Sequence, residues 1–120
     1  MNVTFARWTG EDAVNALSRA GLRIDHVEPA IWPPRSPQPK THREALTAFS
    51  PGLTDPHLVL VFDNPVGLEA WRLWLARYWK ARPYLSVKDN VLLLVSREVS
   101  EDTATAYHRA LATLGSAATA

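Results

Sequence analysis

Two unbroken apolar runs, residues 58–62 (LVLVF) and 91–95 (VLLLV), constrain the fold of this chain more than any other feature. Successive side chains of a strand point to opposite faces of the sheet, so an unbroken apolar run predicts a strand that is buried on both faces. Each run is far shorter than the roughly 18 residues that a membrane-spanning helix needs. The sequence therefore predicts a sheet that requires cover on both of its faces.

Helix-start signals occur at three places, each with a side chain that can accept from the free N–H groups of a first helical turn. The predicted N-caps are Thr9, Asn64 and Ser100. Asp12 completes a capping box with Thr9, and Pro65 suits the first position of the second helix. Gly21 predicts the end of the first helix in the left-handed conformation.

Apolar residues recur at helical spacing after these caps, which predicts that each helix packs one face on the sheet. The apolar arc of the second helix spans about 140° and consists of Leu68, Trp71, Trp74, Leu75, Tyr78 and Trp79. The third helix carries Ala104, Tyr107, Leu111 and Leu114. We expect Trp71 and Trp74 to belong to the core, and Trp32 and Trp79 to be partly exposed.

With short strands expected at residues 3–8 and 22–28, the elements follow the order β-α-β-loop-β-α-β-α. This order predicts an α+β fold of the ferredoxin-like split β-α-β type, a four-stranded antiparallel sheet with two helices, plus a C-terminal helix. Residues 1–114 form one domain in this interpretation, and residues 115–120 a frayed tail. A ferredoxin-like sheet leaves one face open, so the last helix, the Pro-rich loop with Trp32, or a second subunit must cover it.

Residues 29–57 hold seven of the nine prolines and predict a long loop between the second and third strands. Its first part, residues 31–39, favours polyproline II geometry. Only Glu44-Ala45-Leu46 is expected to form a helical turn. The P-x-x-P pattern at residues 34–37 is also typical of ligands for aromatic-lined grooves on partner domains. A stiff spacer that wraps the sheet, with Trp32 packed in, is the favoured explanation.

Several kinds of chemistry are excluded or disfavoured by what the chain lacks. It has no cysteine, which removes disulfides, thiolate nucleophiles, iron–sulfur clusters and cysteine-ligated zinc. Its five glycines are too dispersed for a phosphate-binding loop, and its four histidines show no metal-ligand spacing. We expect no cofactor. The start of the chain has no apolar leader, which favours a cytoplasmic location.

A base, an acid and a conformational constraint come together at only two places, residues 42–44 (HRE) and 55–57 (DPH), both inside the Pro-rich segment. Either place could supply a general base. Ser50 lies nearby, but nothing in the pattern predicts a partner that would activate it as a nucleophile.

These observations predict a non-enzymatic module for protein interaction or assembly, with a homodimer as the expected form. The candidate binding residues combine aromatic rings with cations: Trp32, Arg77, Trp79, Lys80, Arg82 and Tyr84. Such a combination also suits single-stranded nucleic acid along residues 72–88, although a net charge of only +1 argues against it.

An enzymatic alternative uses the same tryptophans. A pocket lined by Trp71, Trp74 or Tyr78, with His26 or His57 at its mouth, could convert an aromatic substrate without a cofactor. A structure in which these tryptophans are packed without a cavity would remove the enzymatic alternative.

Four stretches carry a resemblance to a known family: EDAVNALSRAGLRIDHVE, VFDNPVGLEAWRLWLARY, NVLLLVS and SEDTATAYHRAL. Together they resemble a small bacterial α/β domain that also occurs in some predicted lipoproteins. The resemblance implies an architecture, and it implies no catalytic residue.

Overall fold

The structure, a computed structural model, describes residues 5–32, 35–78 and 84–114. These residues form three helices and five strands in the order α-β-β-β-α-β-β-α. The elements are α1 (Gly10–Arg19), β1 (His26–Pro29), β2 (Glu44–Phe49), β3 (His57–Val61), α2 (Pro65–Tyr78), β4 (Leu85–Lys88), β5 (Val91–Leu94) and α3 (Glu101–Ala112). The predicted α+β class is confirmed.

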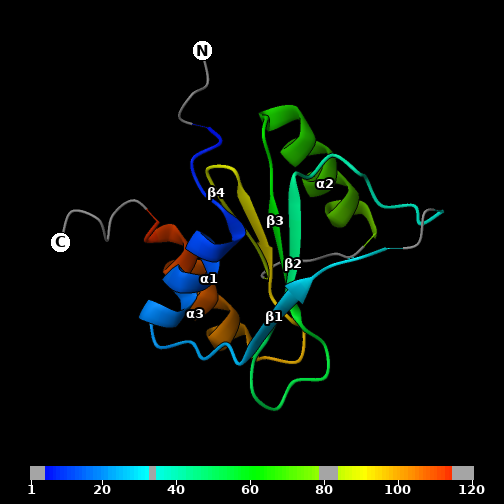
Figure 1. The fold of residues 1–120 in the computed structure, drawn as a ribbon. Coiled ribbons are helices and arrows are strands. Elements are labelled where there is room, and N and C mark those ends of the chain that lie inside the picture. Colours follow the sequence, from blue (N-terminus) through cyan, green and yellow to red (C-terminus); the bar gives the residue numbers. More distant parts are fainter. Residues whose placement is uncertain (1–4, 33–34, 79–83, 115–120) are drawn as a thin grey trace.

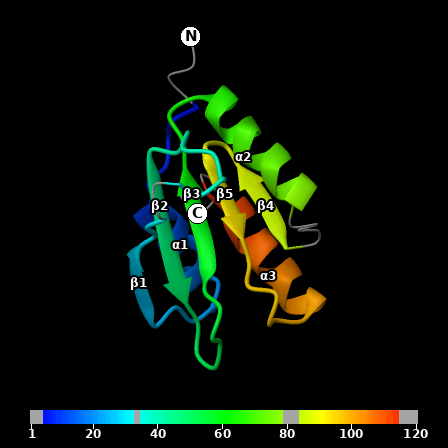
Figure 2. The same ribbon diagram turned by 90° about the vertical axis from the view of Figure 1, so that its right-hand side faces the viewer.

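All strand pairs are antiparallel, and the order across the sheet is β1-β2-β3-β5-β4 (Figure 2). The two predicted apolar strands, β3 and β5, are direct neighbours near the centre. The described part of the chain contributes five strands where the sequence predicted four. β2 and β4 were not expected, and the described part of the strand predicted at residues 3–8 is not a strand. The ferredoxin-like arrangement is therefore not confirmed.

The sheet is covered on both faces by the chain's own helices (Figure 1). α1 and α3 pack on one face, against Val59, Val61, Val91 and Leu93. α2 packs on the other face, against Leu60, Phe62 and Leu92. This three-layer arrangement explains why the two central strands are apolar on both sides, and a second subunit is not needed to cover them. None of the helices in the described part of the chain is long and apolar enough to span a membrane.

The helical turn predicted at Glu44-Ala45-Leu46 is wrong, because these residues begin strand β2. Residues 44–49 (EALTAF) are mostly helix formers, so their local preference is not for a strand. Pairing with β1 on one side and β3 on the other overrides that preference. The predicted long loop is thereby divided into two connections, residues 30–43 and 50–56.

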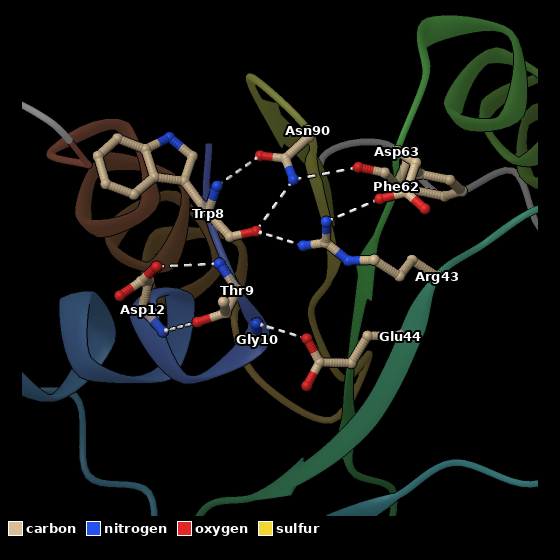
Figure 3. A network of polar contacts seen from close by, with 9 residues as sticks. All are labelled: Trp8, Thr9, Gly10, Asp12, Arg43, Glu44, Phe62, Asp63 and Asn90. Atoms are coloured by element: carbon tan, nitrogen blue, oxygen red, sulfur yellow. Dashed lines mark hydrogen bonds and ion pairs between the residues drawn. The ribbon is translucent and has the colours of Figure 1, made fainter. Parts of the chain in front are cut away.

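The strand predicted at residues 3–8 is also wrong in its described part, because residues 5–8 belong to no strand. Residues 1–4 and the predicted tail, residues 115–120, lie outside the described residues. The backbone of Trp8 is held instead by the buried side chain of Asn90 (Figure 3). Asn90 Oδ1 accepts from Trp8 N at 3.0 Å, and Nδ2 donates to the carbonyl oxygens of Trp8 and Phe62 at 2.9 and 3.1 Å.

Two further side chains extend this network to β2 (Figure 3). Arg43 donates to the Trp8 carbonyl oxygen at 3.0 Å and pairs with Asp63 at 2.7 Å. Glu44 Oε1 accepts from Gly10 N at 2.8 Å, at the positive N-terminal end of α1. A Cβ at Gly10 would meet Leu46 Cδ1, so a side chain here would force the Leu46 side chain to move. The network thus fixes α1 close to the sheet.

The predicted helix caps are confirmed. Thr9 and Asp12 form the capping box, and Ser100 accepts from Thr103 N at 3.1 Å. Asn64 Oδ1 accepts from Gly67 N at 2.8 Å. Gly21 has a φ of +86°, as expected for a residue that ends a helix.

Replacing Asn90 by Ala is expected to lower the free energy of unfolding by about 3 kcal/mol, because it removes all three hydrogen bonds of this buried amide, to Trp8 N, the Trp8 carbonyl oxygen and the buried Phe62 carbonyl oxygen. Urea unfolding followed by circular dichroism measures this loss. The matched control is Asn15→Ala on the exposed face of α1, which should change stability by less than about 0.5 kcal/mol. Equal effects of the two substitutions would contradict the role assigned to Asn90.

Candidate functional site

A groove of about 880 Å³ opens on the α2 face of the sheet. α2 covers the sheet toward β4 and β5, so it leaves the ends of β1, β2 and β3 uncovered (Figure 2). Leu60 and Leu92 are fully buried beneath the helix, whereas Leu58 and Leu94 remain partly exposed in the groove. The groove therefore continues the apolar core of this face out to solvent.

The floor of the groove is a row of directly paired residues on four neighbouring strands. Glu28 pairs with Thr47, Thr47 with Leu58, and Leu58 with Leu94. Paired residues of neighbouring antiparallel strands point to the same face, so their side chains form one continuous surface. This surface is apolar at its centre and carries a carboxylate at the β1 end.

Tryptophans form the walls. Trp71 and Trp74 extend from α2, with ring centroids 5.7 Å apart, and Trp32 comes from the connection between β1 and β2. The Trp32 ring lies 5.5 Å from that of Trp71. Trp71 is 1% exposed, as expected for a core residue, and Trp32 is partly exposed, as also expected. Trp74 was expected in the core but is partly exposed, because it lies at the edge of the core and lines the groove. Two tryptophan side chains thus remain accessible inside a concave surface.

The connection of residues 30–43 lies on the same side of the sheet as α2 (Figure 1) and is held against the first turn of that helix. Thr41 Oγ1 donates to the Gly67 carbonyl oxygen at 2.8 Å. A Cβ at Gly67 would lie 2.8 Å from the Thr41 carbonyl oxygen, so this close approach requires glycine. His42 packs its ring against Trp32 and Trp71, and burial lowers the pKa of His42.

Three buried nitrogens at this wall have no hydrogen-bond partner among residues 5–32, 35–78 and 84–114. They are Nε2 of Gln38, which is 7% exposed, Nδ1 of His42 and Nε1 of Trp71. Gln38 and Trp71 line the groove. An unpaired buried N–H group destabilises a folded protein by about 1–3 kcal/mol, so a ligand acceptor that reached these groups would gain by pairing them.

Charged side chains occur at the rim. Among the described lining residues these are Glu28, Asp55 and Arg97. Asp55 belongs to the 50–56 connection, which Glu98 holds in place by accepting from Thr54 N, Thr54 Oγ1 and Asp55 N. The Thr54 hydroxyl and these backbone N–H groups lower the pKa of Glu98. Glu98 therefore stays ionised at neutral pH beside the rim.

A second polar cluster lies on the opposite face of the sheet and joins Ser50, His57, Ser96 and Tyr107. Ser96 N donates to His57 Nδ1 at 2.9 Å, so the proton of the neutral ring is on Nε2. Nε2 then donates to Ser50 Oγ at 2.9 Å, and Ser50 Oγ lies 2.8 Å from the Tyr107 hydroxyl. This network gives both ring nitrogens of the fully buried His57 a hydrogen-bond partner.

The same geometry argues against nucleophilic catalysis by Ser50. Sequence reasoning did not find its partner, because His57 is brought within hydrogen-bond distance only by the pairing of β2 and β3. A catalytic serine donates its proton to an unprotonated imidazole nitrogen, whereas here the imidazole donates to the serine. We therefore assign Ser50 and His57 a structural role.

The other histidines belong to no metal site in the described part of the chain. Among these residues no group of three or more histidine, aspartate or glutamate side chains could hold a metal ion. His26 pairs with Glu28 at 2.8 Å on the exposed surface, and its ring packs on Phe49. Neither His26 nor His57 lines the groove, so neither lies at its mouth as the enzymatic alternative expected.

Three of the six candidate binding residues, Trp32, Arg77 and Tyr84, belong to the described part of the chain, and they lie on different segments. Trp32 lines the groove, and Arg77 is exposed near the end of α2. Tyr84 packs its ring against the core beneath α1 and α3, and its hydroxyl donates to the Val99 carbonyl oxygen at 3.0 Å. Trp79, Lys80 and Arg82 lie outside the described residues. Arg72, in the predicted basic segment, pairs with Glu69.

Comparison with protein-family models, with curated proteins and with solved structures gives no match for this chain. The resemblance to a small bacterial α/β domain therefore stays a prediction, and the function has to be argued from the groove itself.

The buried His57 makes stability depend on pH. Burial lowers the pKa of His57 to about 4, from 6.5 in the unfolded chain, so the unfolded state binds more protons between these values. We expect the stability of the protein to fall by about 3 kcal/mol through this group as the pH drops from 6.5 to 4. Urea unfolding across this range measures the loss.

His57→Gln is expected to reduce this dependence, because glutamine does not titrate. His108→Gln, on the exposed side of α3, should leave it unchanged and serves as the control. A pH profile that is the same in wild type and His57→Gln would contradict the burial of a neutral imidazole.

Proposed function

We propose that this chain is a non-enzymatic binding module and that the groove beside α2 is its binding site for an apolar ligand. The observation that carries the proposal is a concave apolar surface of about 880 Å³ with two partly exposed tryptophans, Trp32 and Trp74. Its volume falls in the range of about 300–1,000 Å³ that is typical of ligand pockets. Aromatic walls with a few polar groups are also typical of such pockets.

The construction of the groove supports a preformed site. Its floor is made of paired strands and one wall is a helix of 14 residues, so their positions follow from the core packing. The opposite wall is held by the Thr41 to Gly67 hydrogen bond and by the packing of Trp32 on Trp71. A ligand that enters such a groove displaces water from apolar surface without having to order these elements first.

An enzyme that converts an aromatic substrate without a cofactor remains the alternative for the same groove. The two classes differ in what happens to a bound aromatic compound. A binding module releases it unchanged, and chromatography after prolonged incubation distinguishes this result from turnover.

Capture of a protein partner, self-association and a cytoplasmic location also remain proposals. Three exposed apolar side chains favour a protein contact: Ile31 at the groove, and Val66 and Leu73 on the outer side of α2. A homodimer formed through them should dissociate when Leu73 is replaced by a charged residue. Light scattering at several concentrations measures this change.

The test of the groove uses N-phenyl-1-naphthylamine, a neutral aromatic probe that fluoresces in apolar surroundings. We expect saturable binding with a Kd of about 10–100 μM, in keeping with the contribution per atom of small ligands. Trp74→Ala should weaken binding at least about fivefold, because it removes an aromatic wall. Thr47→Phe should block binding by filling the floor. Fluorescence titration gives all three values.

The matched control is Leu73→Ala, one position away on α2 but 57% exposed and outside the groove. It should leave the Kd unchanged. If Leu73→Ala weakened binding as much as Trp74→Ala, the probe would be binding to the outer side of α2. An absence of saturable binding up to about 1 mM would refute the proposed function.

A further inference from the structure

We propose that the ligand of the groove is a small organic cation, a positively charged head group on an apolar body. This inference rests on the proposed function, since it names the chemical class of molecule that the same groove takes. Three features of the groove support it: the signs of the charges at the rim, the tryptophan walls, and the volume.

The rim is more acidic than basic. Glu28 ends the floor on β1, and Asp55 belongs to the connection between β2 and β3, so two separate segments each contribute a carboxylate. Glu98 adds a third carboxylate directly behind Asp55, to whose backbone N–H it is bound. Arg97 is the one basic residue among the described lining residues. The summed charge of these four side chains is negative, which attracts a cation to the groove.

The tryptophan rings of the groove also favour a cationic ligand. The face of an indole ring carries a negative potential and attracts ammonium groups within about 6 Å, most strongly when the charge is shielded from water. Trp32 and Trp74 are partly exposed in the groove, which also contains the carboxylates of Glu28 and Asp55. Carboxylates at a rim and aromatic rings in the walls are together typical of sites that bind substituted ammonium ions.

The volume favours a whole small molecule over the modified side chain of a protein. A quaternary ammonium group alone would occupy only a fraction of about 880 Å³. The remaining space is apolar, with Leu58, Leu75 and Leu94 among its lining residues. The ligand therefore needs an apolar body of appreciable size attached to its charged group.

The experiment compares three probes that share one alkyl chain: octyltrimethylammonium, 1-octanol and octane sulfonate. Calorimetric titration of the full chain is expected to show the tightest binding for the cation and the weakest for the anion, with a difference of about tenfold between them. Equal binding of the three, or tighter binding of the sulfonate, would overturn the inference.

Variants that remove a negative charge test whether Glu28 and Asp55 cause the preference for a cationic ligand. Glu28→Gln combined with Asp55→Asn should weaken octyltrimethylammonium about fivefold and leave 1-octanol within about twofold. Both carboxylates belong to exposed residues, so these near-isosteric changes should leave the fold intact, and either single variant gives a smaller effect in the same direction. Glu11→Gln, on α1 at the opposite face, is the matched control and should change neither affinity. A double variant that behaved like Glu11→Gln would overturn the inference.

The outcomes separate the two proposals. If N-phenyl-1-naphthylamine binds but the cation has no advantage, the proposed function stands and the cationic ligand is wrong. If neither the aromatic probe nor any octyl probe binds, both proposals fail. A trimethyl-lysine peptide that bound at least about tenfold tighter than octyltrimethylammonium would show that the ammonium group recognised by the groove belongs to a modified protein. This result would overturn the assignment to a free small molecule.

Discussion

The burial of β3 and β5 on both faces is the constraint on which the rest of this structure depends. Their side chains alternate between the two faces, so each face needs its own cover. α1 and α3 together cover one face, whereas α2 is the one helix of the described residues on the other face (Figure 1). A single helix of 14 residues is too narrow to cover five strands, and the sheet beyond it stays open to solvent. The groove is the direct result of this imbalance.

Polar groups have different roles on the two faces of the sheet. On the α1 and α3 face, His57 is buried with both ring nitrogens paired, and Asn90 joins the N-terminal segment to the sheet. Such satisfied networks hold elements in one arrangement and leave no reactive group free. On the α2 face, Gln38 and Trp71 keep unpaired nitrogens, and Glu28 and Asp55 add charge. The groove thus offers a ligand two unpaired donors and two carboxylates.

Local signals in the chain predicted the features that depend on neighbouring residues. The N-caps at Thr9, Asn64 and Ser100 and the end of α1 at Gly21 follow from short-range hydrogen bonds and backbone freedom, so a few residues suffice to specify them. The apolar runs of β3 and β5 and the buried Trp71 follow from periodicity over one element. In these cases a short stretch of sequence contains all the residues whose interactions produce the feature.

Features that depend on pairing between distant segments could not be predicted from a short stretch of sequence. β2 is built from helix-forming residues and becomes a strand only because β1 and β3 pair with it. The groove floor joins Glu28, Thr47, Leu58 and Leu94, which pairing between strands brings together. Ser50 meets Tyr107 across 57 positions of the chain. Local sequence thus specifies the elements and their apolar faces, while the register of the sheet and the limited reach of α2 create the site, because both arise from contacts that no single segment encodes.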